Sequence, residues 1–217
     1  MTDQAAFPLK VVDGLRLDEE YRRVLRPGEL MEDRKGRARR LPRFFFEIPS
    51  WEEAVETHLS ENFAVWEFLN VDVREHELLR TAWPRYVPCA VTLIAWQLEL
   101  LRAEVKTLIH VAANGGYRSP SHGLSTYASP HCWGTAVNIY RVGDEHLDDQ
   151  GDIQRINRLA RKVAPAARAA PYGHGPGYAD DHVHLDLGYT LFVPNDTPGE
   201  PENVAEGSRD RDGEGRD

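Results

Sequence analysis

Histidine and aspartate side chains gather late in the chain, in the stretch Asp180 to Asp186 (DDHVHLD). The second part of this stretch alternates polar and apolar residues, which is typical of a β-strand. Because successive side chains of a strand point to opposite faces, His182, His184 and Asp186 would share one face. Two imidazoles and one carboxylate on a common face favour a metal site or an acid–base set.

Two segments further upstream complete an ordered pattern. Residues 114–120 read NGGYRSP, and residues 129–138 read SPHCWGTAVN. Together with DDHVHLDLG at 180–188, they resemble the zinc D-Ala-D-Ala carboxypeptidase group of peptidases, which is related in fold to the Hedgehog signalling domain. The family pattern is Ser-Gly-Tyr-Arg-Ser/Thr-Pro, then Ser-x-His-x-x-Gly-x-Ala-x-Asp, then a closing His-x-Asp strand. The resemblance covers roughly residues 60–190.

The resemblance implies a site for one zinc ion. Carried over position by position, it makes His131 the first ligand and His184 the closing ligand, with Asn138 in the middle position. Zinc held by three protein ligands leaves a fourth position for water and lowers the pKa of that water to about 7. The family's middle ligand is an aspartate, so Asn138 departs from the pattern. A neutral amide oxygen holds zinc less firmly than a carboxylate does.

Three more residues take catalytic positions through the same resemblance. Asp181 matches the acidic general base, His182 a histidine that assists transition-state stabilisation, and Arg118 an arginine that steadies the oxyanion or the substrate carbonyl. A carboxylate beside the attacking water would accept its proton. A guanidinium would then stabilise the developing oxyanion, because its charge is fixed before the reaction begins.

Asn138 leaves several outcomes open. Another group replaces the missing carboxylate, or the site binds metal weakly, or the chain is an inactive relative. The nearby candidates for replacement are His122, His174, Asp180 and Asp186. The favoured function is a zinc metallopeptidase, a hydrolase of the D-Ala-D-Ala carboxypeptidase type that cuts peptidoglycan peptides of the cell wall. The alternatives are a weak or inactive relative that binds cell-wall peptides or a protein partner, and a hydrolase of another small peptide or amide.

The elements predicted to position these segments begin with helices and continue with strands. Ser50 and Glu53 form a capping box that predicts a helix through about Leu59. Apolar residues recur at steps of three and four between Val87 and Val105, which predicts a long helix after Pro88. This order favours an α+β fold, and the resemblance adds a small antiparallel sheet with helices packed on one side, as in the Hedgehog/DD-peptidase fold. The other expected elements are helices at 63–69, 74–81 and 153–163, and strands at 108–112, 135–140 and 182–187.

Charge and composition divide the chain into three parts. We interpret 1–49 as an irregular N-terminal extension, in which Phe44, Phe45 and Phe46 could form a short strand or a docking patch. We interpret 50–193 as the peptidase-like domain and 194–217 as a disordered acidic tail, which is rich in Gly and Pro and poor in large apolar residues. The extension carries six basic residues between Arg34 and Arg43. This basic run is expected to be a solvated linker or, alternatively, a surface for a polyanion such as an acidic wall polymer or the tail itself.

Composition also excludes several classes of protein. The 217 residues, 41% hydrophobic and 28% charged, fit a globular chain that can bury a core. A net charge of −9 argues against nucleic-acid binding, and no apolar run approaches the roughly 20 residues of a membrane span. Cys89 and Cys132 are too few for a disulfide framework and are expected to be buried small side chains. The first residues lack a secretory signal, so we expect a cytoplasmic protein that would need an export route to meet the cell wall. The sequence does not predict the oligomeric state.

Overall fold

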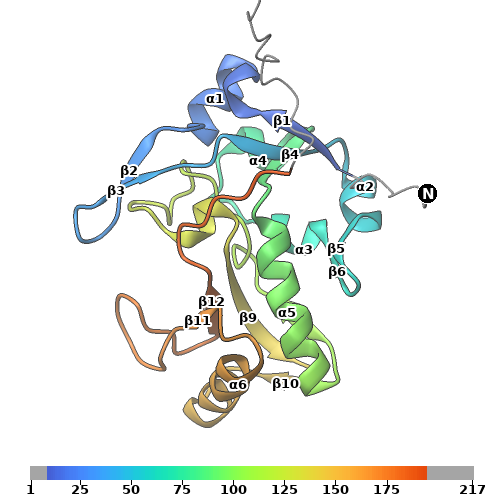
Figure 1. Ribbon diagram of the computed structural model, residues 1–217, viewed down its shortest axis with the longest axis vertical. Coiled ribbons are helices and arrows are strands. Elements are labelled where there is room, and N and C mark those ends of the chain that lie inside the picture. Colours follow the sequence, from blue (N-terminus) through green and yellow to red (C-terminus); the bar gives the residue numbers. More distant parts are fainter. Residues whose placement is uncertain (1–8, 195–217) are drawn as a thin grey trace, which may run out of the picture.

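Antiparallel strands and mostly short helices build the described part of the computed structural model, residues 9–194 (Figure 1). The first half contains β1 (Lys10–Asp13), the 3-10 helix η1 (Gly14–Arg16), α1 (Glu19–Leu25), β2 (Leu30–Glu32), β3 (Ala38–Arg40), β4 (Phe44–Ile48), α2 (Trp51–Glu56), β5 (His58–Ser60), β6 (Phe63–Ala64), α3 (Val65–Leu69) and α4 (Glu77–Thr81). The second half contains β7 (Arg85–Pro88), α5 (Val91–Val105), β8 (Ile109–Val111), the 3-10 helix η2 (Pro130–Trp133), β9 (Ala136–Val142), β10 (Glu145–His146), α6 (Gln150–Val163), β11 (Arg168–Ala169) and β12 (Val183–Asp186). Small antiparallel sheets combined with several helices confirm the α+β class.

The five-stranded sheet is organised around β9. This strand pairs antiparallel with β8, β10 and β12, and β11 pairs with β12. Val137 and Ile139 of β9 are fully buried, as is Leu185 of β12. Because strand side chains alternate, Asn138 and His184 lie on the opposite face of the sheet, where the register makes them direct cross-strand partners.

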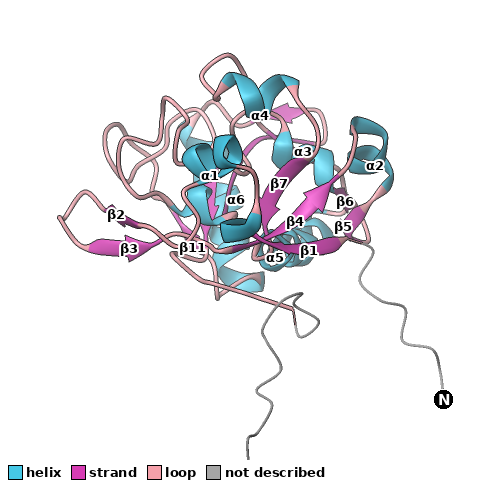
Figure 2. Cartoon of the chain, turned by 90° about the horizontal axis from the view of Figure 1, so that it is seen from above, coloured by secondary structure: helices cyan, strands magenta, loops and turns pink. Residues whose placement is uncertain are grey.

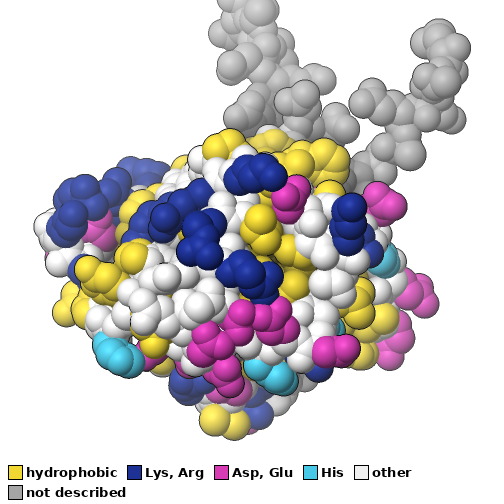
Figure 3. All heavy atoms as spheres, turned by 90° about the horizontal axis from the view of Figure 1, so that it is seen from below, with side chains coloured by type: hydrophobic (Ala, Val, Ile, Leu, Met, Phe, Trp, Pro, Cys, Tyr) yellow, Lys and Arg dark blue, Asp and Glu magenta, His cyan; other side chains and the backbone are white. Residues whose placement is uncertain are grey.

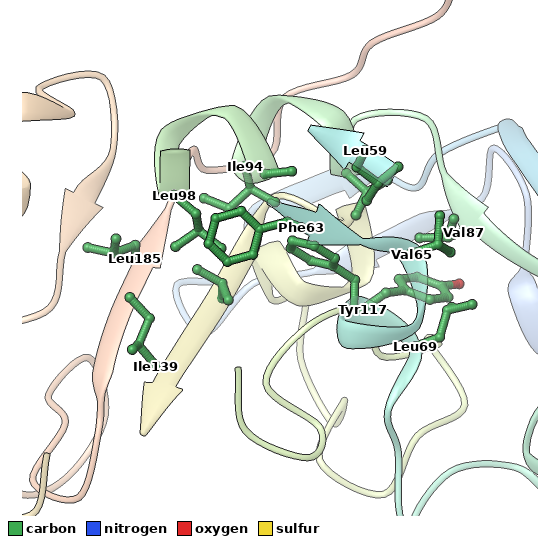
Figure 4. Packing of buried hydrophobic residues seen from close by; sticks show 14 of the residues in the cluster. Leu59, Phe63, Val65, Leu69, Val87, Ile94, Leu98, Tyr117, Ile139 and Leu185 are labelled. Atoms are coloured by element: carbon green, nitrogen blue, oxygen red, sulfur yellow. The ribbon is translucent and has the colours of Figure 1, made fainter. Parts of the chain in front are cut away.

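Two helices cover the apolar face of this sheet. α5 contacts β9, α6 contacts β11 and β12, and the two helices contact each other. Figure 4 shows Ile94 and Leu98 of α5 packed near Ile139 and Leu185 of the sheet, and all four belong to the main core. The helices therefore pack against one face of the sheet, and Asn138 lies on the other face.

The predicted helices form, with differences at their ends. Ser50 caps α2 by accepting a hydrogen bond from the backbone N–H of Glu53, but the helix ends at Glu56 because the next residues turn into β5. The long helix predicted after Pro88 is α5. The helix predicted at 153–163 is α6, which begins three residues earlier because the Asp149 carboxylate caps it.

Residues 9–49 are not irregular, and that prediction is wrong, although the short strand expected at Phe44 to Phe46 forms as the start of β4. β1 and β4 form a sheet with β7, which lies side by side with them in Figure 2. Phe45, Phe46 and Val87 of this sheet are buried in the main core together with Leu9. Residues 9–49 therefore share a core with the rest of the described chain, and the boundary at residues 49/50 stays an interpretation of the sequence.

The basic run also has structure of its own. It contributes β3 to a hairpin with β2, in which the buried Asp33 carboxylate accepts hydrogen bonds from Arg37 and Arg39. Arg43 pairs with Asp13 at 2.7 Å. The expected linker is therefore a folded hairpin, and Figure 3 shows basic side chains gathered at the left edge of the molecule, the side on which the hairpin lies in Figure 1.

Two expectations concern the ends and the surroundings of the chain. The tail at 194–217 lies outside the described residues, apart from Pro194. Within residues 9–194, no helix has both the length and the apolar character needed to cross a bilayer.

Candidate functional site

The three segments singled out in the sequence meet on the face of the central sheet that is turned away from α5 and α6. His131 lies in η2, immediately before β9, while Asn138 and His184 come from β9 and β12. The ring centroids of His131 and His184 are 5.2 Å apart, and His184 Nδ1 lies 2.8 Å from Asn138 Oδ1. The structure thus brings the three predicted ligand positions together.

His131 is held as a neutral imidazole. Its Nδ1–H donates to the carbonyl oxygen of Gly116 at 2.8 Å, so its Nε2 lone pair remains available. The side chain is buried, and burial, followed by the positive charge of Arg118, holds the pKa of His131 well below the usual histidine value. A neutral, oriented imidazole is the form in which histidine binds metal ions.

The carbonyl that anchors His131 belongs to Gly116, at a position where a larger residue would not fit. A Cβ atom built on Gly116 would lie 2.5 Å from the backbone Cα and O atoms of Phe68. The next residue, Tyr117, donates its N–H to the Phe68 carbonyl, which fixes the approach of the two segments. The glycine of the NGGYRSP motif therefore permits a close backbone contact that places the carbonyl used by His131.

His184 is fixed from its outer side by a carboxylate. Its Nε2 lies 3.0 Å from Asp186 Oδ2, and the same oxygen accepts a hydrogen bond from Arg168 at 3.0 Å. Burial lowers the pKa of His184, and the Asp186 carboxylate opposes that shift. Asp186 itself is buried, and its hydrogen bond to His184 helps to hold its pKa below the usual carboxyl value despite its burial. The pair is therefore a neutral imidazole whose Nε2–H faces a carboxylate.

Asn138 occupies the inner side of His184. With its proton on Nε2, a neutral His184 presents a lone pair at Nδ1. In the structure the Asn138 Oδ1 faces this nitrogen at 2.8 Å; turning the amide about its terminal bond presents its N–H end to the lone pair, which an aspartate carboxylate cannot do. Asparagine can therefore satisfy His184 Nδ1, the nitrogen that the contact with Asp186 leaves for a metal ion.

None of the four candidate replacements supplies the missing carboxylate. Asp186 is bound to the outer nitrogen of His184, and Asp180 pairs with His174 on the exposed glycine-rich loop. The buried His122 uses both of its ring nitrogens, one toward Asn114 at 2.9 Å and one toward the backbone N–H of Leu124. Each group is engaged elsewhere, so none of the four takes the place of the missing carboxylate.

Arg118 borders this site. Its backbone N–H donates to the carbonyl of His131 at 3.3 Å, and burial lowers the pKa of its guanidinium to about 10. Its Nε atom is buried and has no hydrogen-bond partner within the described part of the chain. A buried guanidinium nitrogen without an acceptor is costly unless a ligand supplies one.

The Arg118 loop is clamped by a residue that sequence reasoning missed. The buried Glu75 carboxylate accepts hydrogen bonds from the backbone N–H of Ser119 at 3.0 Å and from its hydroxyl at 2.6 Å. Glu75 lies 44 residues away in a loop before α4, and no local motif marks it. Asp186 was recognisable in part, because strand alternation placed it on the face of His184.

Asp181 and His182 lie at the rim rather than in the buried centre. The Asp181 side chain is 79% exposed, and its Oδ1 lies 2.5 Å from His182 Nδ1. The positive charge that His182 can carry still contributes to lowering the pKa of His131. His182 is thus within electrostatic reach of the site, while Asp181 faces solvent.

Of the three candidate metal ligands, two have the chemistry that suits a metal ion: His131 and His184. In the span 9–194, no group of three or more His, Cys, Asp or Glu side chains is arranged to hold an ion. His131 and His184 are neutral imidazoles with their outer nitrogens already bonded, which suits zinc. The set reaches three only when the Asn138 oxygen is counted. Two ligand atoms about 2.1 Å from a tetrahedral ion lie roughly 3.4 Å apart, so a metal would open the Asn138–His184 contact slightly.

The two cysteines take no part in this site, as expected. Both are free and buried. Burial raises the pKa of Cys89 to about 12 and also raises that of Cys132, whose Sγ lies 3.4 Å from Ser125 Oγ. Thiols held in the protonated form are packing residues rather than nucleophiles.

Comparison with protein-family models, with curated proteins and with solved structures gives no match to this chain.

Proposed function

We propose that this protein is a zinc metallopeptidase of the D-Ala-D-Ala carboxypeptidase type, with a Hedgehog/DD-peptidase-like fold and peptidoglycan peptides as substrates. The observation that carries the proposal is the pairing of His131 with His184. Two imidazoles from separate elements approach to 5.2 Å between ring centres, and a carbonyl and a carboxylate hold their outer nitrogens. The substrate class comes from the resemblance of the three ordered motifs.

His131, Asn138 and His184 are the residues that would hold the metal. Zinc bound there supplies an acidified water molecule and a Lewis acid. The two imidazoles bind without first losing a proton, because burial keeps both neutral. Asn138 contributes only an uncharged oxygen, so the proposed site binds metal more weakly than one with an aspartate in this position.

The other side chains divide the work of peptide hydrolysis. Arg118 lies next to His131, and its unpartnered Nε supplies a hydrogen-bond donor for the substrate carbonyl and for the oxyanion that develops from it. Asp181 is exposed and accepts the proton of the attacking water, and His182 steadies the Asp181 carboxylate through their hydrogen bond. This substrate class also requires that the protein meet the cell wall or peptides released from it.

Hydrolysis of a D-Ala-D-Ala peptide by the native chain and by Asn138→Asp tests the proposal. We expect slow, chelator-sensitive release of D-alanine by the native chain in the presence of zinc. Asn138→Asp should be at least about tenfold faster at limiting zinc, because a carboxylate restores charge to the ligand set. Asn70→Asp makes the same chemical change at an exposed position and should leave the rate unchanged. Absence of cleavage by both the native chain and Asn138→Asp at saturating zinc contradicts the proposal.

A second candidate function has an observation of its own. The Asn138 amide lies 2.8 Å from His184 Nδ1 and, turned with its N–H end toward that nitrogen, satisfies it without an ion. In that state the protein is an inactive relative of the peptidases that binds a cell-wall peptide or a protein partner through Arg118. Peptide binding by the native chain without cleavage, combined with cleavage by Asn138→Asp, identifies this second function.

A further inference from the structure

A cavity lies beside β8, at some remove along the sheet from the histidine pair. Its volume is about 300 Å³, and its walls come from the β6–α3 segment, the C-terminal part of α5, the β8 strand and Tyr140 of β9. β8 pairs with β9 on the side opposite β12. None of His131, Asn138 and His184 lines this cavity, so the cavity is separate from the proposed metal site.

Two opposite charges face this cavity without meeting each other. Arg102 of α5 and Glu67 of α3 both line it, and no ion pair within the described residues includes either of them. The Nε atom of Arg102 is buried and has no hydrogen-bond partner in residues 9–194. A buried guanidinium nitrogen in that state favours an acceptor supplied from outside the chain.

Glu67 is the complementary group. One of its carboxylate oxygens accepts a hydrogen bond from the backbone N–H of Ala64 at 3.0 Å. Burial raises its pKa, with a further contribution from the negative charge of Glu99. A cation placed beside this carboxylate would oppose that shift, so Glu67 favours an ammonium group as its partner.

Aromatic rings line the space around these two charges. Trp66 is partly exposed and packs edge-on against Trp51 at 6.1 Å between ring centroids. Tyr140 belongs to β9, and its ring centroid lies 6.1 Å from that of His110. Flat apolar surface beside polar groups suits a ligand that has a hydrocarbon or ring portion.

We propose that this cavity binds a free α-amino acid with an apolar or aromatic side chain, its carboxylate on Arg102, its ammonium on Glu67 and its side chain between Trp66 and Tyr140. The volume of 300 Å³ is sufficient for a molecule of this size and is at the lower end of small-molecule sites. A polyphosphate would meet the Glu67 carboxylate, and a purely apolar ligand would leave the buried Arg102 Nε without an acceptor and Glu67 without a cation. A zwitterion satisfies both charges at once.

Calorimetric titration with three probes tests the ligand class: phenylalanine, phenylalanine amide, which lacks the carboxylate, and N-acetylphenylalanine, which lacks the ammonium. We expect the native chain to bind phenylalanine at one site. We expect it to bind each derivative at least about tenfold more weakly, the effect of removing one charge-assisted hydrogen bond. No saturable binding of phenylalanine, or equal binding of all three probes, overturns the proposal.

Two variants, each of which replaces a charged side chain with a neutral glutamine, test which residue binds which end of the ligand. Arg102→Gln should remove the preference for phenylalanine over its amide, and Glu67→Gln should remove the preference over the acetylated form while still accepting the Ala64 hydrogen bond. Arg158→Gln and Glu61→Gln make the same changes at exposed positions that do not line the cavity, and they should bind all three probes as the native chain does. If both cavity variants keep both preferences, the cavity is not the binding site and the proposal fails.

Discussion

The buried centre of the histidine site and its exposed rim contain similar residues in different states. At the centre, His184 lies between two hydrogen-bond partners, and its carboxylate partner Asp186 is only 6% exposed. At the rim, only two residues away, His182 bonds to an Asp181 side chain that is 79% exposed. Both pairs join an imidazole to a carboxylate, but only the central pair is locked by packing.

The difference indicates which residues fix the position of a bound ligand and which can change their hydrogen-bond partners during a reaction. A buried, fully bonded imidazole cannot change partners without exposing an unsatisfied group, so the centre determines where a ligand binds. An exposed aspartate exchanges its partners with water at little cost. We therefore assign binding to the centre and proton transfer to the rim, and the following variants test that division.

The largest effect is expected from Gly116→Ala. The added Cβ would lie 2.5 Å from the Phe68 backbone, which cannot move away as a flexible side chain can. We expect a loss of about 3 kcal/mol in the free energy of unfolding, with displacement of the His131 anchor. Denaturant unfolding measures it. Gly123→Ala is the matched control, because its added Cβ meets no atom closer than 3.5 Å. Equal effects of the two substitutions would show that the close approach at Gly116 has no special role.

Asp186→Asn should have the next largest effect. It removes the buried carboxylate that accepts hydrogen bonds from His184 and Arg168. We expect a cost of about 2 kcal/mol in the free energy of unfolding, because a buried network loses its charged acceptor. Asp180→Asn, on the exposed loop, should cost less than about 0.5 kcal/mol. A larger cost at Asp180 than at Asp186 would reverse the assignment of centre and rim.

Acidification should also lower the free energy of unfolding, by a smaller amount for each of the two buried histidines. In the unfolded chain both histidines titrate near about 6.5, whereas in the folded protein burial lowers the pKa of His131 and of His184. Below about pH 6.5 the unfolded state binds protons that the folded state does not, so the free energy of unfolding falls as pH falls, by up to about 1.4 kcal/mol per pH unit for each histidine. Urea unfolding at several values between about pH 7.5 and about pH 5.5 measures the slope. His131→Gln should reduce the slope, and a slope unchanged by this variant would show that His131 is not the titrating group.

Asp181→Asn should have the smallest effect on stability. The side chain is exposed, so we expect the free energy of unfolding to change by less than about 0.5 kcal/mol. The same variant should lose peptide cleavage while keeping the metal affinity of the native chain, which separates proton transfer from metal binding. A variant that loses metal affinity along with cleavage would place Asp181 in the ligand set instead.

The sequence predicted the parts of this site that depend on local periodicity. Strand alternation placed His184 and Asp186 on one face, and the apolar spacing after Pro88 predicted α5. The clamp of Glu75 on Ser119 joins residues 44 positions apart, so no local pattern could show it. In the N-terminal segment, the short strand expected at Phe44 to Phe46 is the start of β4, whereas β1 was missed because it is only four residues long and is stabilised by pairing with β4.

Zinc binding tests the central claim most directly. Titration of the metal-free native chain and of Asn138→Asp, followed by calorimetry, gives stoichiometry and affinity without requiring a substrate. We expect one zinc ion per chain in both proteins, with an affinity at least about tenfold higher for Asn138→Asp because its ligand set carries a negative charge. His184→Ala in the Asn138→Asp background should abolish this binding. If Asn138→Asp binds no zinc, or binds it equally well without His184, then His131, position 138 and His184 do not form one metal site.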